Sequence, residues 1–192
     1  MRLFIGIELP EVLKDTVAAV ASRVREDIAR AAPDAQVRWV PPANLHITVW
    51  FLGEVREPRV EPLVAALTPP LDARSFTLRI GGGGAFPPTG APRAIWLGIA
   101  AGSKELVSVH EQLRGRLAPL GFAPETRPYS PHLTIARVKD VRPRDARAMR
   151  APLDEVAADV GQCEVQGATL FVSRPTRTGA EYEPLCRVQL AG

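Results

Sequence analysis

The sequence has two cysteines, three histidines and no long apolar run, and each shortage excludes a class of protein. Cys163 and Cys186 stand apart and form no C-x-x-C pair, so they give neither a disulfide framework nor enough ligands for a structural zinc ion. The first apolar run is broken by Glu8 and Pro10, and it is too short for a signal peptide or a membrane span. We therefore expect a protein of the reducing cytoplasm that does not associate with a membrane.

Several catalytic motifs are also missing. There is no H-E-x-x-H, no tight carboxylate cluster beside a histidine and no G-x-S-x-G. The glycine run 81–84 is not followed by Gly-Lys-Ser/Thr, so it is no P-loop, and we expect it to form a turn between strands. These absences argue against a zinc hydrolase, a serine hydrolase and a P-loop nucleotidase. The sequence predicts no metal and no cofactor.

The composition is that of an ordinary globular protein. A hydrophobic fraction of 46% and a charged fraction of 23% allow one good core or two small lobes that share one. The formal net charge of +3 comes from arginine rather than lysine, and it suits a phosphate-bearing ligand without indicating nucleic acid by itself. No low-complexity linker divides the chain, so we expect a single two-lobed domain over 1–192 that is a monomer.

Apolar spacing predicts two similar series of elements. We expect strands at 3–9, 37–40, 45–53, 76–80, 94–100, 131–137, 165–173 and 185–190. We expect helices at 11–31, 58–67, 103–121 and 144–160, and a loop at 174–183. The order of strand, helix and histidine-bearing strand appears twice, about half a chain apart. This repetition predicts two α+β lobes related by a pseudo-two-fold axis, with a cleft between them.

Two of the three histidines stand in matching contexts. His46 and Thr48 lie in L-H-I-T-V, and His132 and Thr134 lie in P-H-L-T-I. Because alternate side chains of a strand share a face, each histidine and its threonine point the same way, and the apolar residues between them point into a core. One His-x-Thr carries little weight, but two copies in similar strands predict one active site built from two halves.

Paired histidines and threonines suit chemistry at phosphorus. A neutral imidazole can take a proton from water, and a protonated one can give a proton to the leaving oxygen. Each threonine hydroxyl can donate to a non-bridging phosphate oxygen and stabilise the charge that grows on it. None of these steps requires a metal ion.

At these residues the chain resembles the 2H phosphoesterase superfamily, which is named for two His-x-Thr/Ser motifs. Within it the chain is most similar to the bacterial and archaeal RNA 2′,3′-cyclic phosphodiesterases, also called 2′-5′ RNA ligases. The likeness extends beyond the motifs to M-R-L-F-I-G-I at 1–7, F-L-G-E-V at 51–55, P-R at 92–93, W-L-G at 96–98 and Y-E-P-L at 182–185. It implies a bilobal α+β fold with two antiparallel sheets flanking the central cleft and helices on the outside.

The resemblance also implies an activity. Family members open a 2′,3′-cyclic phosphate at an RNA 3′ end without a metal, the 3′ oxygen leaves, and the phosphate stays on the 2′ oxygen. The substrate here would be such an RNA end or a small nucleotide with the same group. By the same likeness His46 is favoured as the acid and His132 as the base, although the sequence alone leaves this open.

Arg137, the sixth residue of the second motif, is a family position for contacting phosphate. Strict strand alternation turns its side chain away from His132 unless a bulge re-aims it.

Other functions remain open. The main role could be 2′-5′ ligation of RNA, or non-catalytic binding of an RNA end or a nucleotide. The vast excess of water favours hydrolysis over ligation, and two titratable pairs are more than binding needs. Tyr129 or Phe51 could stack on a base, although we expect Phe51 to pack in the core. His110 is expected to be a surface or packing residue of its helix.

Overall fold

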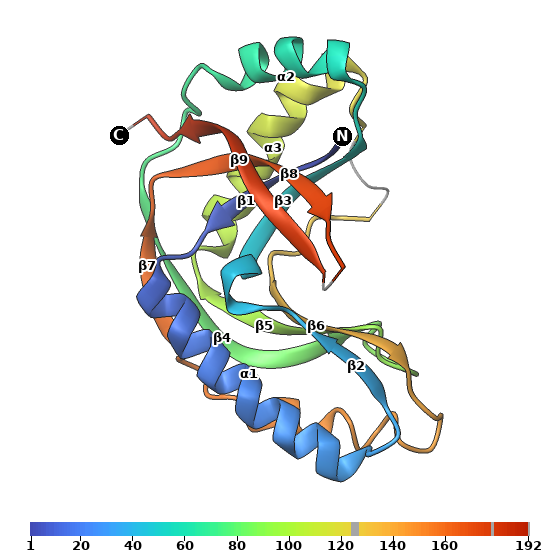
Figure 1. The fold of residues 1–192 in the computed structure, drawn as a ribbon. Coiled ribbons are helices and arrows are strands. Elements are labelled where there is room, and N and C mark those ends of the chain that lie inside the picture. Colours follow the sequence, from blue (N-terminus) through green and yellow to red (C-terminus); the bar gives the residue numbers. More distant parts are fainter. Residues whose placement is uncertain (124–126, 178, 192) are drawn as a thin grey trace.

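Two antiparallel sheets form the frame of the molecule (Figure 1). The structure is a computed structural model and describes residues 1–123, 127–177 and 179–191. Sheet A has the strand order β3-β1-β8-β9, from β1 (Arg2–Glu8), β3 (His46–Glu54), β8 (Gly167–Pro175) and β9 (Ala180–Gln189). Sheet B has the order β2-β6-β5-β4-β7, from β2 (Gln36–Trp39), β4 (Phe76–Phe86), β5 (Ala94–Ala101), β6 (Leu133–Asp140) and β7 (Gly161–Val165). The predicted α+β fold with two antiparallel sheets is confirmed.

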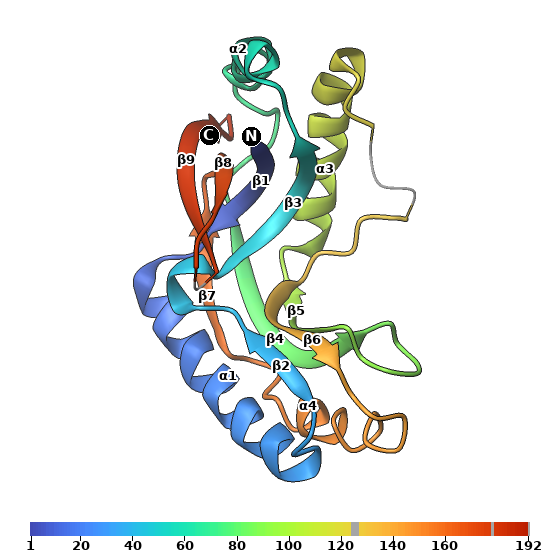
Figure 2. The ribbon, with the colours of Figure 1, turned by 45° about the vertical axis from the view of Figure 1, so that its right-hand side comes forward.

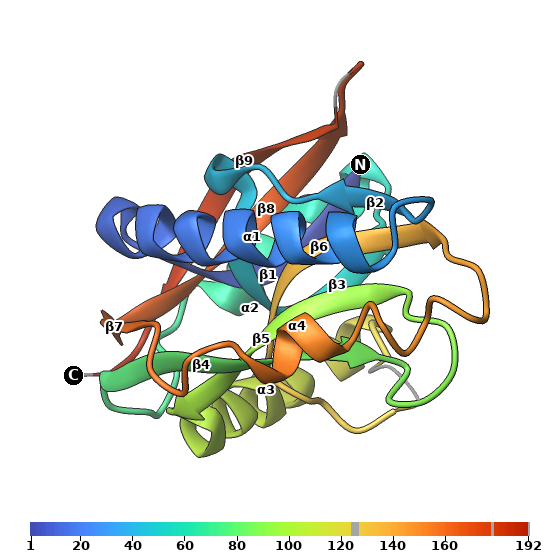
Figure 3. The ribbon, with the colours of Figure 1, turned by 90° about the horizontal axis from the view of Figure 1, so that it is seen from below.

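The helices lie outside the sheets and cross between the lobes. They are α1 (Glu11–Ala31), α2 (Val60–Leu67), α3 (Ser103–Leu117) and α4 (Ala151–Asp154), with 3-10 turns η1 (Pro42–Asn44), η2 (Glu57–Arg59) and η3 (Ala118–Leu120). Helix α1 follows a strand of sheet A yet contacts β7 and α4 of the other lobe, whereas α3 follows a strand of sheet B yet contacts β3 (Figure 2). Seen from below, α1 and α4 cover strands of sheet B (Figure 3). None of the described helices is long and apolar enough to cross a membrane.

Helix α1 forms where the apolar spacing predicts it. Its buried side chains are Leu13, Val17, Val24 and Ile28, which recur at intervals of four and seven residues and so share one face. Pro10 stands directly before the first helical residue. An amide hydrogen at this position would have no partner within the helix, so proline costs no hydrogen bond here. The predicted bounds of this helix are therefore confirmed.

The glycine run is not a turn between strands, as the sequence suggested, but part of the long strand β4. Close packing explains the glycines: a Cβ on Gly81 would lie 1.8 Å from the carbonyl oxygen of Ala158, and one on Gly84 would lie 2.2 Å from the Trp96 ring. Gly82 adopts a φ of +72°, and the pairing with β5 shifts register here. Strand β4 is curved (Figure 1). Its glycines let it pass close to the backbone of Ala158 and to the Trp96 ring.

The helix predicted at 144–160 is wrong. Turns occupy 143–150, α4 is a single turn, and the predicted helix ends beside β7, a strand that the sequence analysis missed. The apolar spacing itself is real, because Ala146, Met149 and Leu153 are buried. Pro152, however, lacks an amide hydrogen and disfavours a longer helix through it. The loop predicted at 174–183 is likewise mostly strand, since β8 extends to Pro175 and β9 begins at Ala180, although residue 178 lies outside the described residues.

The packing around β4 predicts the effect of one substitution. Gly81→Ala should lower the free energy of unfolding by roughly 1–3 kcal/mol or more, because its methyl group meets backbone that has no room to move. Gly115→Ala is the matched control: nothing lies within 4 Å of its Cβ position in α3, so it should be neutral or stabilise by about 0.5–1 kcal/mol. Urea unfolding curves measure both, and equal stability of the two variants would contradict the packing argument.

Candidate active site

The two motif strands contact each other and line one cleft. His46 and Thr48 of β3, together with His132 before β6 and Thr134 within it, all face a cavity of about 820 Å³. Ile47, between the first pair, is fully buried on the other side of its strand. The alternation predicted from sequence therefore places the four side chains together, and both imidazoles are half-buried rather than hidden from solvent.

A β-bulge in β6 re-aims Arg137. Opposite β5, Thr134 pairs with Trp96 and Ala136 pairs with Ile95, which leaves Ile135 as an extra residue. Two consecutive residues of β6 then point into the core, and the next side chain returns to the face of Thr134. Arg137 is exposed and lines the cleft, as the sequence analysis expected only if a bulge intervened.

The same irregularity follows the threonine of β3. Thr48 pairs with Gly6 of β1, the pairing resumes at Trp50, and Val49 is the extra residue. Val49 and Trp50 are both buried, and Phe51 turns outward. Phe51 is 42% exposed and lines the cleft, so the prediction that it packs in the core is wrong.

Backbone carbonyls orient both imidazoles in the same way. The Nδ1 atom of His46 lies 2.8 Å from the carbonyl oxygen of Asn44, and that of His132 lies 2.7 Å from the carbonyl oxygen of Ser130. Since a carbonyl only accepts, Nδ1 carries the hydrogen in each ring, and Nε2 holds the lone pair when the ring is neutral. Nε2 of His46 is 3.0 Å from the Thr48 hydroxyl, which can donate to it.

Aromatic packing surrounds the ring of His46. The ring centroid lies 4.7 Å from that of Phe4 and 5.1 Å from that of Tyr182, whose plane is nearly perpendicular. Burial lowers the pKa of His46, the hydrogen bond to the Asn44 carbonyl opposes this, and the positive charge of Arg137 lowers it further. The neutral ring is thus favoured in the free protein.

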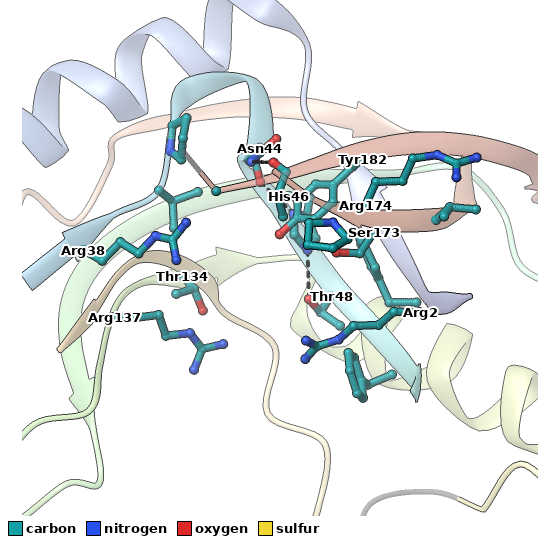
Figure 4. A pocket seen from close by; sticks show the side chains of 18 of the residues that line it. Arg2, Arg38, Asn44, His46, Thr48, Thr134, Arg137, Ser173, Arg174 and Tyr182 are labelled. Carbon is teal, nitrogen blue, oxygen red and sulfur yellow. Dashed lines mark hydrogen bonds between the residues drawn. The ribbon is translucent and has the colours of Figure 1, made fainter. Parts of the chain in front are cut away.

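Arginine side chains from four strands line the cleft, and the one from β8 is Arg174. Arg38 of β2 stands directly opposite Arg137 of β6, and both line the cavity together with Arg2 of β1. Figure 4 shows Arg38 and Arg137 on the side of Thr134, and Arg2 on the side of Thr48. Like charges directly opposite on a sheet repel each other, and an anion between them relieves that cost. Sequence analysis missed Arg2 and Arg38, because only the strand pairing shows where they lie.

A stack of three rings supports the motif strands from behind. The ring of His110 in α3 lies between Trp50 and Tyr129, with centroids 4.8 Å and 4.5 Å away. The Tyr129 hydroxyl donates to the backbone carbonyl of Thr48 at 3.1 Å. His110 is a packing residue, as expected, and the alternative of base stacking by Tyr129 fails because its ring belongs to this stack and not to the cleft lining. The stack ties the first motif to the segment that leads into the second.

Within the part of the chain that the structure describes, no three His, Cys, Asp or Glu side chains are grouped so that they could hold a metal ion. The titratable groups of the cleft are instead two imidazoles, one tyrosine, several arginines and Glu54, whose carboxylate lies 3.6 Å from the N-terminal amine. Such a set can accept one proton, donate another and bind an anion.

Comparison with known proteins agrees with this architecture. The family model described as LigT like phosphoesterase matches the chain twice, over residues 12–96 and 97–182. Each match contains one His-x-Thr pair, so the internal repetition predicted from sequence is also a repetition of the family pattern.

Individual relatives match along nearly the whole chain. Proteins named RNA 2′,3′-cyclic phosphodiesterase from Methanothermobacter thermautotrophicus and Aeropyrum pernix are 34% and 33% identical, over 95% and 88% of this chain and 95% and 94% of their own. The crystal structure of Escherichia coli LigT complexed with 3′-AMP superimposes with a TM-score of 0.77 at 27% identity, covering 100% of this chain and 98% of that one. With two copies of its motif facing one cleft, the chain belongs to the LigT-like phosphoesterases of the 2H phosphoesterase superfamily.

Proposed function

We propose that this protein hydrolyses 2′,3′-cyclic phosphates, on RNA 3′ ends or on small nucleotides, to 2′-phosphomonoesters. One observation carries the proposal: two His–Thr pairs from separate halves of the chain face a single cleft that arginines make positive. The names of the relatives, RNA 2′,3′-cyclic phosphodiesterase, support the same substrate class.

The proposed reaction divides two proton transfers between the histidines. One neutral imidazole takes a proton from water through Nε2 as the water oxygen attacks phosphorus. The bond from phosphorus to the 3′ oxygen breaks, and the protonated imidazole gives its proton to that oxygen. Both rings present Nε2 to the cleft because Nδ1 is engaged by a carbonyl, and this shared orientation supports a two-histidine mechanism that needs no metal.

Thr48, Thr134 and Arg137 hold the phosphate in this proposal, and Arg38 joins them. The threonine hydroxyls donate to non-bridging oxygens, and the guanidinium groups offset the charge that develops there. Arg38 is assigned to this task because it stands directly opposite Arg137 and shares the cleft with it.

The likeness to the family favours His46 as the acid. Burial of His46, however, disfavours the protonated form that an acid needs. An acid must be protonated, whereas the aromatic surroundings favour the neutral ring in the free protein. A phosphate anion bound beside the ring stabilises the imidazolium form. His46 therefore becomes a competent acid only when the phosphate arrives.

The first prediction concerns the two histidines. His46→Ala and His132→Ala should each lower kcat on adenosine 2′,3′-cyclic phosphate by about 10²- to 10⁴-fold, the usual contribution of one positioned acid or base. The wild-type rate should be unchanged in EDTA, and chromatography should identify the product as the 2′-monophosphate. Circular dichroism checks that both variants fold. Near-normal turnover by the double variant would exclude the mechanism, and binding without turnover by the wild type would favour a binding module.

The second prediction concerns protonation. NMR titration of the His46 ring should give a midpoint below 6.5 in the free protein, since burial disfavours the charged form, and a higher midpoint with inorganic phosphate bound. A midpoint at or above 6.5 without phosphate would contradict the effect of burial. A midpoint that stays low with phosphate would give His46 the role of base and His132 that of acid.

The third prediction concerns Arg38. Arg38→Ala should weaken the binding of adenosine 2′-monophosphate by about 10- to 100-fold, as expected for the loss of a charged hydrogen bond. Arg114→Ala, on the exposed face of α3, removes the same charge away from the cleft and should bind as the wild type does. Calorimetric titration measures both, and equal affinities would remove Arg38 from the phosphate site.

A further inference from the structure

Asn44 joins the first motif to the last strand of sheet A. Its backbone carbonyl accepts the hydrogen bond from Nδ1 of His46 at 2.8 Å. Its side-chain amide nitrogen, Nδ2, donates to the backbone carbonyl of Ala180 at 2.6 Å. Ala180 is the first residue of β9 and lies 136 positions further along the chain. One residue therefore orients the imidazole and is itself held by a distant strand.

The turn that carries the Asn44 carbonyl lies at the surface. Asn44 is the last residue of η1, a single 3-10 turn, and residues 41–43 before it are exposed. Pro41 and Pro42 have no amide hydrogen, so neither can donate a hydrogen bond that would hold the turn to a neighbour. Hydrogen bonds within a 3-10 turn also have poorer geometry than those of an α-helix. The hydrogen bond from the Asn44 side chain therefore adds an anchor that these prolines cannot supply.

Strand β9 reaches His46 a second time through Tyr182. Alternate residues of a strand share a face, so Tyr182 lies on the same face as Ala180. The Tyr182 ring stands at 88° to the ring of His46, with 5.1 Å between the centroids. Figure 4 shows Asn44, His46 and Tyr182 together on one side of the cleft, which all three line. The start of β9 thus acts on the imidazole both through Asn44 and by direct ring contact.

The carbonyl that orients the second imidazole is held differently. Ser130 occupies the equivalent position, two residues before the histidine, and its carbonyl accepts from Nδ1 of His132 at 2.7 Å. Ser130 is exposed, whereas Asn44 is half-buried and bonded to β9. The two halves therefore share the carbonyl contact but differ in how that carbonyl is anchored.

We propose that Asn44 is a positioning residue for His46. Its carboxamide, bonded to Ala180, fixes the peptide group whose carbonyl keeps the hydrogen on Nδ1. Nε2 then stays directed at the cleft, as either an acid or a base requires. The role given to His46 rests on the proposed cyclic phosphodiesterase function, whereas the orientation of its ring does not.

Kinetics of two variants that each lose a side-chain amide test this role. Asn44→Ala should lower kcat on adenosine 2′,3′-cyclic phosphate by about 10- to 100-fold, the order expected when a reacting group shifts by about 1 Å. KM should stay within about twofold, because the groups assigned to the phosphate are untouched.

Gln112→Ala is the matched control for the loss of a tertiary hydrogen bond. The Gln112 carboxamide bonds the backbone nitrogen and carbonyl of Asp72 at 2.7 and 2.9 Å, and neither residue lines the cleft. Its loss should lower the melting temperature without lowering kcat. A wild-type kcat for Asn44→Ala, or an equal loss of kcat in Gln112→Ala, would overturn the positioning role.

NMR separates the positioning role from the proposed function, because it needs no substrate. The nitrogen chemical shifts of the His46 ring distinguish a hydrogen on Nδ1 from one on Nε2, and they are read at about pH 9, where the ring is neutral. The wild type should hold the hydrogen on Nδ1, whereas Asn44→Ala should show both tautomers and leave His132 unchanged. If the wild type opens no cyclic phosphate, the proposed function fails while the spectra still decide the role of Asn44. A hydrogen that stays on Nδ1 of His46 in Asn44→Ala would contradict that role.

Discussion

The antiparallel pairing of each motif strand with its neighbour, β3 with β1 and β6 with β5, leaves one extra residue after each threonine and so determines what the cleft contains. Regular alternation would send the sixth residue of each motif into the core. The bulges at Val49 and Ile135 place two consecutive residues in the core and bring Phe51 and Arg137 to the face of the His–Thr pairs. The cleft therefore receives three side chains from each motif instead of two, and the third is the one that differs between the halves.

The halves are interwoven rather than merely joined. Helix α1 covers sheet B although it follows a strand of sheet A, and α3 covers β3 although it follows a strand of sheet B. The stack of Trp50, His110 and Tyr129 adds a direct link, and the Tyr129 hydroxyl holds the backbone of Thr48. A rigid relation between the two histidines is what proton transfer at one phosphorus atom requires.

The sequence predicts the parts of this site that follow from local rules. Strand alternation places His46, Thr48, His132 and Thr134 correctly, and helical spacing finds α1 and α3. What sequence analysis missed depends on pairing between distant segments. The register of β2 against β6 brings Arg38 beside Arg137 in the cleft, and the neighbours of β4 explain glycines that otherwise suggest a turn. The spacing of apolar residues likewise does not reveal the bulge that exposes Phe51.

The order in which sheet A is assembled along the chain has a consequence for synthesis on the ribosome. Strand β1, which begins at Arg2, lies between β3 and β8 in this sheet, and β8 begins only at Gly167. The rings that enclose His46 include Phe171 of β8 and Tyr182 of β9, which are translated long after His46. Until they emerge, the first motif has its neighbouring strand β1 but lacks strands β8 and β9 of sheet A and part of its aromatic enclosure. A nascent chain therefore carries an incomplete cleft until sheet A is complete.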